Sequence, residues 1–380
     1  MFTVIVVVAV TLMQSYVFWR AASVPIVRMH VPLKVLVGLG GLIWTVCLLG
    51  ALPESEVTGP LATALEFSSM TWLGVLFLMT VALLAVEAAT GFGLLYPKMA
   101  PRLRGAALAV GWTLAILALV QGLRAPVVQS HEVYSPRLPA ALDGTVIVVM
   151  SDLHLGSMLG TAWLAARAEQ VRAEHPDAIV LIGDVFEGHG PPAAPWRAIL
   201  SGMASPLGTW GVTGNHEMHS GARANDALFD NAGVHLLRNG WVELRPGLVL
   251  AGVENLPSGP GRRMNGDAVA AALAGRPPGA TILLTHAPPA PDVVAGSGVD
   301  LMLSGHTHGG QLWPFGYLVR HWFPLFEGRY QVGPTTVIVS RGTGTWGPRM
   351  RLWRPAEIIR VTLRSGAEAN ASTVDTHELK

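Results

Sequence analysis

Long apolar stretches are confined to the first third of the chain. Each approaches or exceeds the roughly 20 residues that a helix needs to cross the hydrocarbon core of a bilayer. The four stretches are residues 2–19, 35–52, 70–92 and 106–123. A helix on the surface of a soluble domain needs a polar face, which these nearly uncharged runs lack. The pattern therefore predicts a transmembrane region with four helices over residues 1–124.

The charges between these predicted helices favour one orientation. The first and third connections contain basic residues, whereas the second contains Glu54, Glu56 and Glu66 and no Lys or Arg. Cytoplasmic loops carry an excess of Lys and Arg, so both basic connections are expected in the cytoplasm. The basic residues are Arg20, Arg28, Lys34, Lys98, Arg102 and Arg104. Four spans would then place the rest of the chain outside the cytoplasm, and a different number of spans would reverse that side.

The rest of the chain has a different pattern. Residues 125–143 are punctuated by prolines and are predicted to be a linker. Over residues 144–364, short apolar runs alternate with helical patterns, which is typical of an α/β domain. Residues 365–380 are small and polar, and we expect a disordered tail.

Composition agrees with this division. Hydrophobic residues make up 51% of the 380 residues and charged residues 13%, about half the charged share of a soluble domain. The formal net charge of +1 lacks the basic footprint of a nucleic-acid binder, so nucleic acid is not expected as a structural partner. Cys47 is the only cysteine, which excludes a disulfide framework and a cysteine metal site. Composition therefore predicts that the lipid bilayer is a partner, and it leaves the oligomeric state open.

Candidate chemistry follows five short apolar runs in the second part of the chain. The runs are residues 145–150, 178–182, 210–213, 281–285 and 301–304. The polar residues that follow them are Asp152, His154, Asp184, Asn215, His216, His286, His306 and His308. If the runs are strands, these residues lie at the carboxyl ends, where α/β sheets place their ligands. One site assembled from distant parts of the chain is therefore expected.

The residue types of this predicted site favour divalent transition metals. Imidazole suits Zn and Fe, whereas carboxylate and carbonyl oxygen suit harder ions such as Mn. The seven residues other than His216 exceed the need of one ion, and two ions about 3.5–4 Å apart that share a carboxylate would use all of them. Two dications outweigh two aspartates, so a bound hydroxide and an anionic substrate are favoured. Water is the expected nucleophile, since no Gly-x-Ser-x-Gly elbow is present.

These blocks resemble, in order and spacing, the motifs of calcineurin-like metallophosphoesterases. The blocks are Asp152-Leu153-His154, Gly183-Asp184, Gly214-Asn215-His216-Glu217, His286 and Gly305-His306-Thr307-His308. The resemblance implies an α/β fold, a four-layer α/β/β/α sandwich preceded here by the four-helix transmembrane bundle. It implies that one ion takes Asp152, His154 and His308, the other takes Asn215, His286 and His306, and Asp184 bridges them. His216 would contact the phosphate and assist the leaving group.

Within that family the chain looks like a branch of small bacterial phosphodiesterases with membrane-linked members. The likeness rests on the run from Gly305 to Gln311 followed by Pro314 and on the segments 326–330, 340–344 and 355–358. The resemblance favours two Mn ions, with Fe, Zn or Mg as alternatives, and a phosphodiester over a phosphomonoester. Glu187 departs from the Asp that is common in Gly-Asp-x-x-Asp versions of the second block, but it is not a metal ligand in the family pattern.

Two further features leave alternatives open. Residues 312–326 are rich in Trp, Phe and Tyr, which indicates either a loop packed on the core or an apolar rim that meets the bilayer or a lipid chain. Arg341 and Arg349 can bind a second phosphate or a carboxylate of the substrate through their planar guanidinium groups, and ordinary surface pairing is an equal alternative.

The predicted function is a multi-pass membrane phosphoesterase with an extracytoplasmic catalytic domain. Its substrate is expected to be a phosphorylated small molecule or a lipid or envelope component. One alternative is a nucleotide-sugar lipid pyrophosphatase, which would normally act on the cytoplasmic face. The other is a non-catalytic, metal-dependent sensor of a phosphorylated ligand, which would bind metal without turnover.

Overall fold

The computed structural model describes residues 2–50, 59–187, 194–219, 229–254 and 266–367. The chain divides into two compact units. The helical unit consists of Met1–Arg124 together with Gly347–Trp353, and the α/β unit consists of Ala125–Trp346 and Arg354–Lys380. The short segment Gly347–Trp353 therefore belongs with the helices, although it lies late in the sequence.

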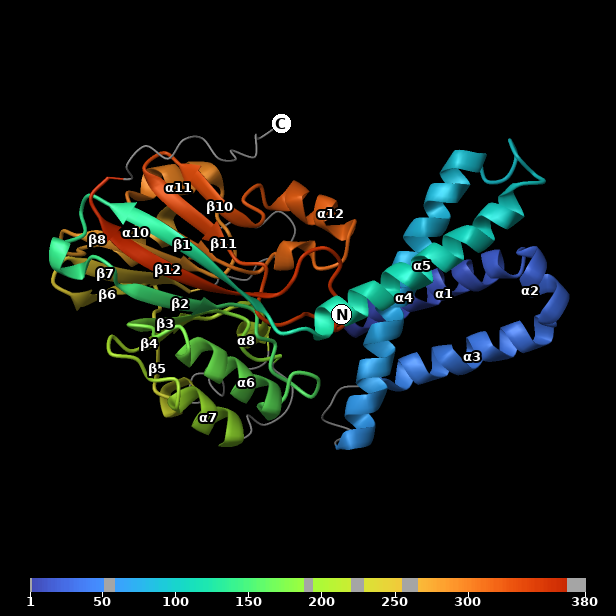
Figure 1. Cartoon of the computed structure of the whole chain (residues 1–380), viewed down its shortest axis with the longest axis horizontal. Helices are drawn as coiled ribbons and strands as arrows, with labels where there is room; N and C mark the ends of the chain where they lie inside the picture. The colour runs from blue at the N-terminus through green and yellow to red at the C-terminus, as the bar shows by residue number, and fades with distance from the viewer. Residues whose placement is uncertain (1, 51–58, 188–193, 220–228, 255–265, 368–380) are drawn as a thin grey trace. The chain divides into compact units, whose positions relative to one another are not determined.

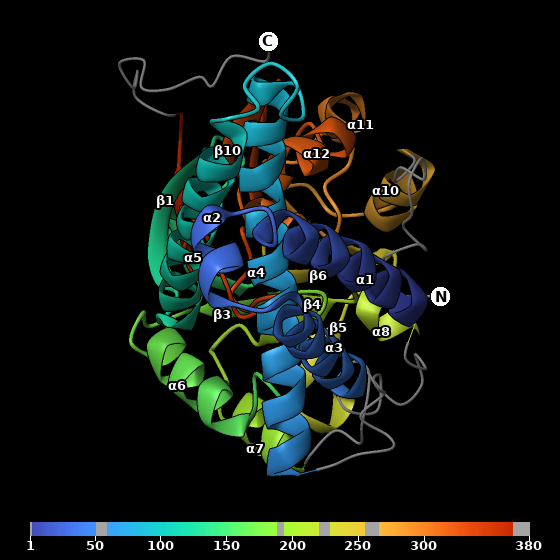
Figure 2. The ribbon, with the colours of Figure 1, turned by 90° about the vertical axis from the view of Figure 1, so that its right-hand side faces the viewer.

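The helical unit contains the predicted apolar helices (Figure 2). They are α1 (Phe2–Ala21), α2 (Pro25–His30), α3 (Leu33–Gly50), α4 (Pro60–Thr90) and α5 (Ala100–Leu123). Among the described residues, three helices are long and apolar enough to cross a membrane, namely α3, α4 and α5. The apolar part of α1, Ile5–Ala21, is shorter. Length and composition thus support three spans clearly, and the fourth stays a prediction.

Two of these helices begin earlier than the sequence predicted. The expected starts were residues 70 and 106, but α4 begins at Pro60 and α5 at Ala100. Proline stands in the first turn of both helices, where its fixed φ favours initiation and its missing N–H costs nothing. The prediction was late because hydropathy marks only the apolar part of a helix, whereas helix formers such as Ala, Leu and Glu extend it further.

One buried ion-pair cluster lies inside the helical unit. Glu87 of α4 has no exposed surface, and its Oε1 atom lies 2.7 Å from Arg104 Nε and 3.1 Å from Arg20 Nε. Arg104 Nη2 also donates to Glu87 Oε2 at 3.1 Å. Because a charge among apolar helices is costly unless it is paired, these contacts explain how Glu87 is accommodated.

The segment Gly347–Trp353 packs on the helices through close backbone contacts. The Arg351 amide donates to the carbonyl of Ala118 at 2.8 Å, and the Arg351 side chain is fully buried. A Cβ atom on Gly122 of α5 would lie 2.4 Å from the carbonyl oxygen of Arg349. Glycine at this position therefore permits the segment to lie directly against α5.

The α/β unit is built from two six-stranded sheets (Figure 1). The first has the order β1 (Val127–Ser135), β12 (Glu357–Ser365), β2 (Val146–Met150), β3 (Ala178–Ile182), β4 (Thr209–Val212) and β5 (Val234–Leu236). The second has the order β10 (Gly328–Val332), β11 (Thr335–Val339), β9 (Leu301–Ser304), β8 (Ala280–Thr285), β7 (Leu248–Val253) and β6 (Gly240–Arg245). Strands β2 to β5 are parallel, whereas β12 runs antiparallel to β2. The predicted α/β fold is confirmed, with mixed sheets.

Alternating side chains of the central strands join the layers. Ile147 and Val149 of β2 pack in a core shared with Leu284 of β8, so the two sheets face each other. Val148 and Met150 point the other way, as the period of two requires. Helices α6 (Thr161–Arg172) and α7 (Ala194–Ser201) cover the outer face of the first sheet, and α10 (Gly266–Leu273) and α11 (Pro291–Ser297) cover the second (Figure 1).

The predicted linker differs from the structure. Residues 125–143 contain β1, which pairs in parallel with β12 from Val127 opposite Glu357 to Ser135 opposite Ser365. Pro126 and Pro136 flank this strand and therefore mark its ends, because proline cannot donate to a sheet ladder. Strand β12 also reaches one residue into the predicted tail, and residues 368–380 of that tail lie outside the described residues.

Candidate metal centre

The predicted polar residues converge at the carboxyl ends of strands from both sheets. Those after β2, β3 and β4 come from the first sheet, and those after β8 and β9 come from the second. The residues of the first sheet are Asp152, His154, Asp184, Asn215 and His216, and those of the second are His286, His306 and His308. The expectation of one site at the strand ends is met, because their side-chain atoms lie within contact distance, as the following paragraphs describe.

One group of ligating side chains contains Asp152, His154 and His308. Their nitrogen and oxygen atoms lie within 4.8 Å of one another. The Nε2 atoms of His154 and His308 are 3.1 Å apart, and His308 Nε2 lies 3.4 Å from Asp152 Oδ1. These are the three residues that the family resemblance assigns to one ion.

A second group contains Asp184, His286 and His306. Asp184 Oδ2 lies 3.2 Å from His286 Nε2, which lies 3.2 Å from His306 Nδ1. Asn215 Oδ1 is 3.2 Å from the same His286 nitrogen. Asp184 Oδ2 also lies 3.9 Å from His154 Nε2, so this carboxylate stands between the two groups, where a bridging ligand is expected.

The donor chemistry of both groups fits a divalent cation. Each neutral imidazole has one unprotonated nitrogen, and nitrogens that face each other with carboxylate oxygens nearby form a ready set of ligands. His286 Nδ1 lies 2.9 Å from the carbonyl of Ile182, a contact that turns its Nε2 toward the group. A hydrogen bond from the second ring nitrogen to a carbonyl is the usual support of a ligating histidine.

Unusual backbone conformations are concentrated in these ligand loops. The φ angles of five predicted ligands lie between 47° and 69°, in the left-handed region. They are Asp152, His154, Asp184, His306 and His308. A residue with a Cβ atom pays about 1–2 kcal/mol in this region, so the rest of the fold must hold each of them there. Such strain is typical of functional sites.

Glycines beside the ligands are required for close approach. A Cβ atom on Gly305 would lie 1.8 Å from Ser151 Oγ and 2.5 Å from Asp152 Oδ2. A Cβ atom on Gly214 would lie 2.1 Å from Asp184 Oδ1. No L-amino acid with a side chain fits at either position without displacing a predicted ligand, which explains the glycines in these motifs.

Burial and opposite charge shift the pKa values of these groups strongly. Burial lowers the pKa of His286, but the Asp184 carboxylate outweighs it and raises that pKa to about 10. Burial raises the pKa of Asp184, but His286 and His154 hold it well below its usual range. Burial and the neighbouring His286 lower the pKa of His306 to about 3. The buried carboxylates of the centre therefore favour positive charge beside them.

Glu217 is a supporting residue that the sequence analysis quoted but did not assign. Its side chain is buried and accepts hydrogen bonds from the backbone amides of Asp184 at 2.9 Å, Phe186 at 3.0 Å and Gly214 at 2.7 Å. Burial raises the pKa of its carboxyl. Glu217 therefore ties the loops after β3 and β4 together, and its place at the end of the Gly214–Glu217 block was the available signal.

Glu187 connects a predicted ligand to the predicted catalytic histidine. Its Oε1 lies 2.8 Å from His154 Nδ1 and its Oε2 lies 3.1 Å from His216 Nδ1. Burial lowers the pKa of His216, but Glu187 and Asp184 outweigh it and raise that pKa to about 9. His216 is therefore protonated at neutral pH. The longer Glu in place of the more common Asp does not prevent these two contacts.

The two arginines predicted to bind substrate have other surroundings. Arg341 Nε donates to Glu357 Oε2 at 2.8 Å, and the Arg341 amide donates to Glu357 Oε1 at 2.9 Å. Arg349 lies in the segment that packs with the helices, and burial lowers the pKa of its guanidinium. A substrate contact by either residue stays a prediction.

Aromatic side chains flank the centre. The ring of Phe323 lies 5.1 Å from that of His306, and the ring of Trp346 lies 6.3 Å from that of His216. Gln311 holds Trp346 in place, because its side chain donates to the Trp346 carbonyl and accepts from the Trp346 amide, both at 3.0 Å. Within residues 312–326, Leu325 is buried whereas helix α12 (Phe315–Trp322) contains no buried residue, so part of the segment packs on the core and an apolar rim over α12 stays a prediction.

Two mixed sheets with histidines and carboxylates at their strand ends agree with the resemblance to metallophosphoesterases, and the comparisons with known proteins show the family. The family model of calcineurin-like phosphoesterases matches residues 145–310. A bovine transmembrane protein with a metallophosphoesterase domain is 34% identical over 74% of this chain and 67% of its own length. An uncharacterized metallophosphoesterase of Campylobacter jejuni is 32% identical over 64% of each chain, and one of Aquifex aeolicus is 34% identical over 62% of this chain and 91% of its own.

The chain belongs to the calcineurin-like phosphoesterase family. The predicted membership is confirmed, and metal binding and phosphoester hydrolysis are the chemistry of this family. The apolar helices, together with relatives named as transmembrane proteins, indicate association with a membrane.

The contacts of Glu187 generate a test of its role. Glu187→Gln removes the charge that raises the pKa of His216, so the pH above which kcat falls should shift downward as His216 loses its proton earlier. We expect kcat to fall by up to about 100-fold, the lower end of what a positioned general acid contributes. The measurement is kcat against pH with saturating metal, and the control is Glu169→Gln at an exposed position of α6. An unchanged pH profile would contradict this role.

Proposed function

We propose that this protein is a membrane-anchored phosphoesterase that hydrolyses a phosphodiester, or secondarily a phosphomonoester, with water. The carrying observation is the pair of ligand groups with Asp184 between them. Asp152, His154 and His308 would hold one ion, and Asn215, His286 and His306 the other. We favour Mn, with Fe, Zn or Mg as alternatives. Such ions polarise the phosphoryl group and lower the pKa of water.

His216 is positioned to act on the substrate. Its ring lies 4.8 Å from that of His154, so it stands beside the first ligand group. Its backbone amide donates to Asp184 Oδ1 at 2.9 Å, and Glu187 contacts its Nδ1, so both contacts fix the ring beside the candidate metal centre. Because it carries a proton at neutral pH, it can bind the phosphate and donate that proton to the leaving oxygen.

Asp184→Asn tests the shared metal centre. The change removes the carboxylate charge between the two groups, so we expect metal content to fall. Phosphodiester turnover should drop by more than about 100-fold, because that is the upper end of the effect of losing an outer-shell partner and Asp184 is proposed to be a direct ligand. The measurement is metal content by elemental analysis together with hydrolysis of a chromogenic phosphodiester during Mn titration. Asp292→Asn, at an exposed position of α11, is the matched control. Bound metal without turnover in the unaltered protein, with any divalent ion, would favour the sensor.

We further propose that the α/β unit lies outside the cytoplasm. The support is the charge of the connections, since Arg28 and Lys34 precede or begin α3, and Lys98 and Arg102 surround the start of α5. With both basic connections in the cytoplasm and α1 as the fourth span, the chain after α5 emerges on the opposite side.

A single introduced cysteine tests this orientation. Glu169→Cys, made in a Cys47→Ser background, should react with a membrane-impermeant maleimide in right-side-out vesicles, because the Glu169 side chain is 73% exposed. Labelling after membrane disruption provides the control for total reactivity. Reaction only after disruption would reverse the orientation and favour the pyrophosphatase alternative, which would normally act on the cytoplasmic face.

Helix α12 supports a lipid or envelope substrate. It begins at Phe315, and residues 311–314 separate it from the 3₁₀ turn His308–Gly310, which contains a predicted ligand. Phe315, Tyr317, Leu318 and Trp322 on it are between 41% and 68% exposed. Exposed aromatic side chains suit a membrane interface, where one end is apolar and the other is wet. We propose that α12 contacts the bilayer or the apolar part of the substrate.

The combined change Tyr317→Ser and Trp322→Ser tests this contact. We expect turnover of a phosphodiester lipid in vesicles to fall about 10-fold or more, since burying an aromatic side chain contributes on the order of 1.5–3 kcal/mol. Turnover of a soluble chromogenic phosphodiester should change little. Trp241→Ser, at a 37% exposed position of β6, is the control. Equal effects on both substrates would argue against a lipid contact.

A further inference from the structure

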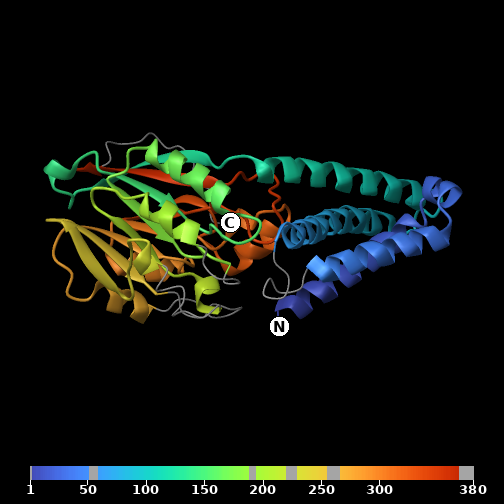
Figure 3. The same ribbon diagram turned by 90° about the horizontal axis from the view of Figure 1, so that it is seen from below.

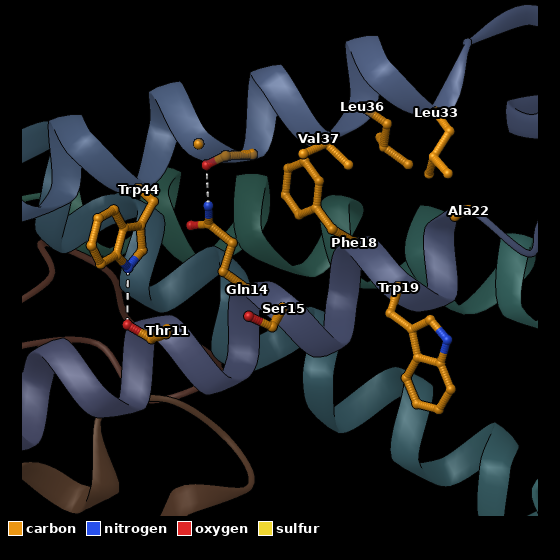
Figure 4. A pocket seen from close by; sticks show the side chains of 12 residues that line it. Thr11, Gln14, Ser15, Phe18, Trp19, Ala22, Leu33, Leu36, Val37 and Trp44 are labelled. Carbon is orange, nitrogen blue, oxygen red and sulfur yellow. Dashed lines mark hydrogen bonds between the residues drawn. The ribbon is translucent and has the colours of Figure 1, made fainter.

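A pocket of 480 Å³ lies between α1 and α3 within the helical unit (Figure 4). The two helices run side by side and are joined through α2 (Figure 3). Apolar side chains such as Phe18, Leu36 and Trp44 line it, and Gly41 of α3 leaves space there, because a Cβ atom on it would meet no atom within 4 Å. Its volume falls within the range of about 300–1,000 Å³ that is typical of ligand pockets.

Three polar side chains along this pocket, those of Thr11, Gln14 and Trp44, already have partners within the protein. The Gln14 amide donates to the Gly40 carbonyl at 2.5 Å, and its oxygen accepts from Trp72 Nε1 at 3.0 Å. Trp44 Nε1 donates to Thr11 Oγ1 at 2.9 Å (Figure 4). Because these groups are satisfied, the pocket offers an occupant mainly apolar contacts, which is the chemistry of an acyl chain.

The helix pair α1 and α3 has a basic end, although its basic residues do not line the pocket. Ala22 and Leu33 line the pocket where α1 and α3 meet their connection. That connection and the start of α3 contain Arg28 and Lys34, both exposed, whereas residues 21–53 contain no Asp or Glu. Basic residues at the end of membrane helices attract anionic headgroups. An apolar pocket between two helices with a basic end therefore complements an anionic lipid.

We propose that this pocket binds an anionic phospholipid of the bilayer. One acyl chain lies between α1 and α3, and the headgroup phosphate contacts Arg28 and Lys34. The bound lipid fills the space beside Gly41 of α3, next to α1, whose apolar part is shorter than those of α3, α4 and α5. The proposal is independent of the metal centre, since it rests on the helical unit alone.

Two glycines of α3 provide a matched test of the pocket. A Cβ atom on Gly41 or on Gly38 would meet no atom within 4 Å, so both positions have room for a larger side chain, but only Gly41 lines the pocket. In the full-length protein in detergent, native mass spectrometry should detect one retained phosphatidylglycerol. Gly41→Leu should reduce that retention at least 10-fold, whereas Gly38→Leu should preserve it. Equal retention in both variants, or equal loss, would overturn the proposal.

The basic end is tested with exposed side chains only, so this test remains valid if Gly41→Leu alters helix packing. The combined change Arg28→Gln and Lys34→Gln should lower affinity for phosphatidylglycerol about 30-fold, toward that for phosphatidylcholine. The control is Lys98→Gln with Arg102→Gln, at exposed positions around the start of α5, outside the connection between α1 and α3. Equal affinity of the unaltered protein for both lipids, or an equal effect of both charge pairs, would overturn the proposal.

Discussion

Negative charge buried at the strand ends is the constraint on which the α/β unit depends. Asp152 is 0% exposed, Asp184 2% and Glu217 1%. Removing a carboxylate from water costs several kcal/mol unless hydrogen bonds and opposite charge compensate. Backbone amides compensate Glu217, and imidazoles surround Asp184. The predicted ligands are crowded around this charge, which accounts for the glycines beside them. The left-handed backbone of five predicted ligands follows from the sharp turns that bring the strand ends of both sheets together.

The central part of this fold could be predicted from sequence because its signals are local. Strands β2 and β3 are buried on both faces, so each is a continuous run of apolar residues. Strand β1 gave no such signal. It is an edge strand with mostly polar or half-exposed positions, and its partner β12 lies at the other end of the domain sequence. Pairing of that kind depends on the assembled sheet, and proline-rich flanks concealed it.

The candidate site shows the same division between local and distant signals. Each predicted ligand directly follows an apolar run, so its position at a strand end followed from the sequence. Glu217 and Glu187 act through contacts with loops far away in the chain, and a single sequence does not show which backbone amide or histidine a carboxylate will reach. The residue type of Arg341 likewise did not reveal its partner, Glu357 of strand β12.

The helical unit also contains a buried charge, but there the surroundings are apolar helices. Glu87 lies among apolar helices, and two arginines from α1 and α5 surround it, so three helices are tied together by one cluster. Apolar side chains such as Leu42 of α3 and Leu61 of α4 remain exposed on these helices, and a bilayer accounts for them as water does not. The aromatic residues of α12 in the α/β unit are likewise exposed, and contact with water does not account for them either. Paired buried charges and exposed aromatic residues are therefore the two features on which the proposed action at a lipid surface rests.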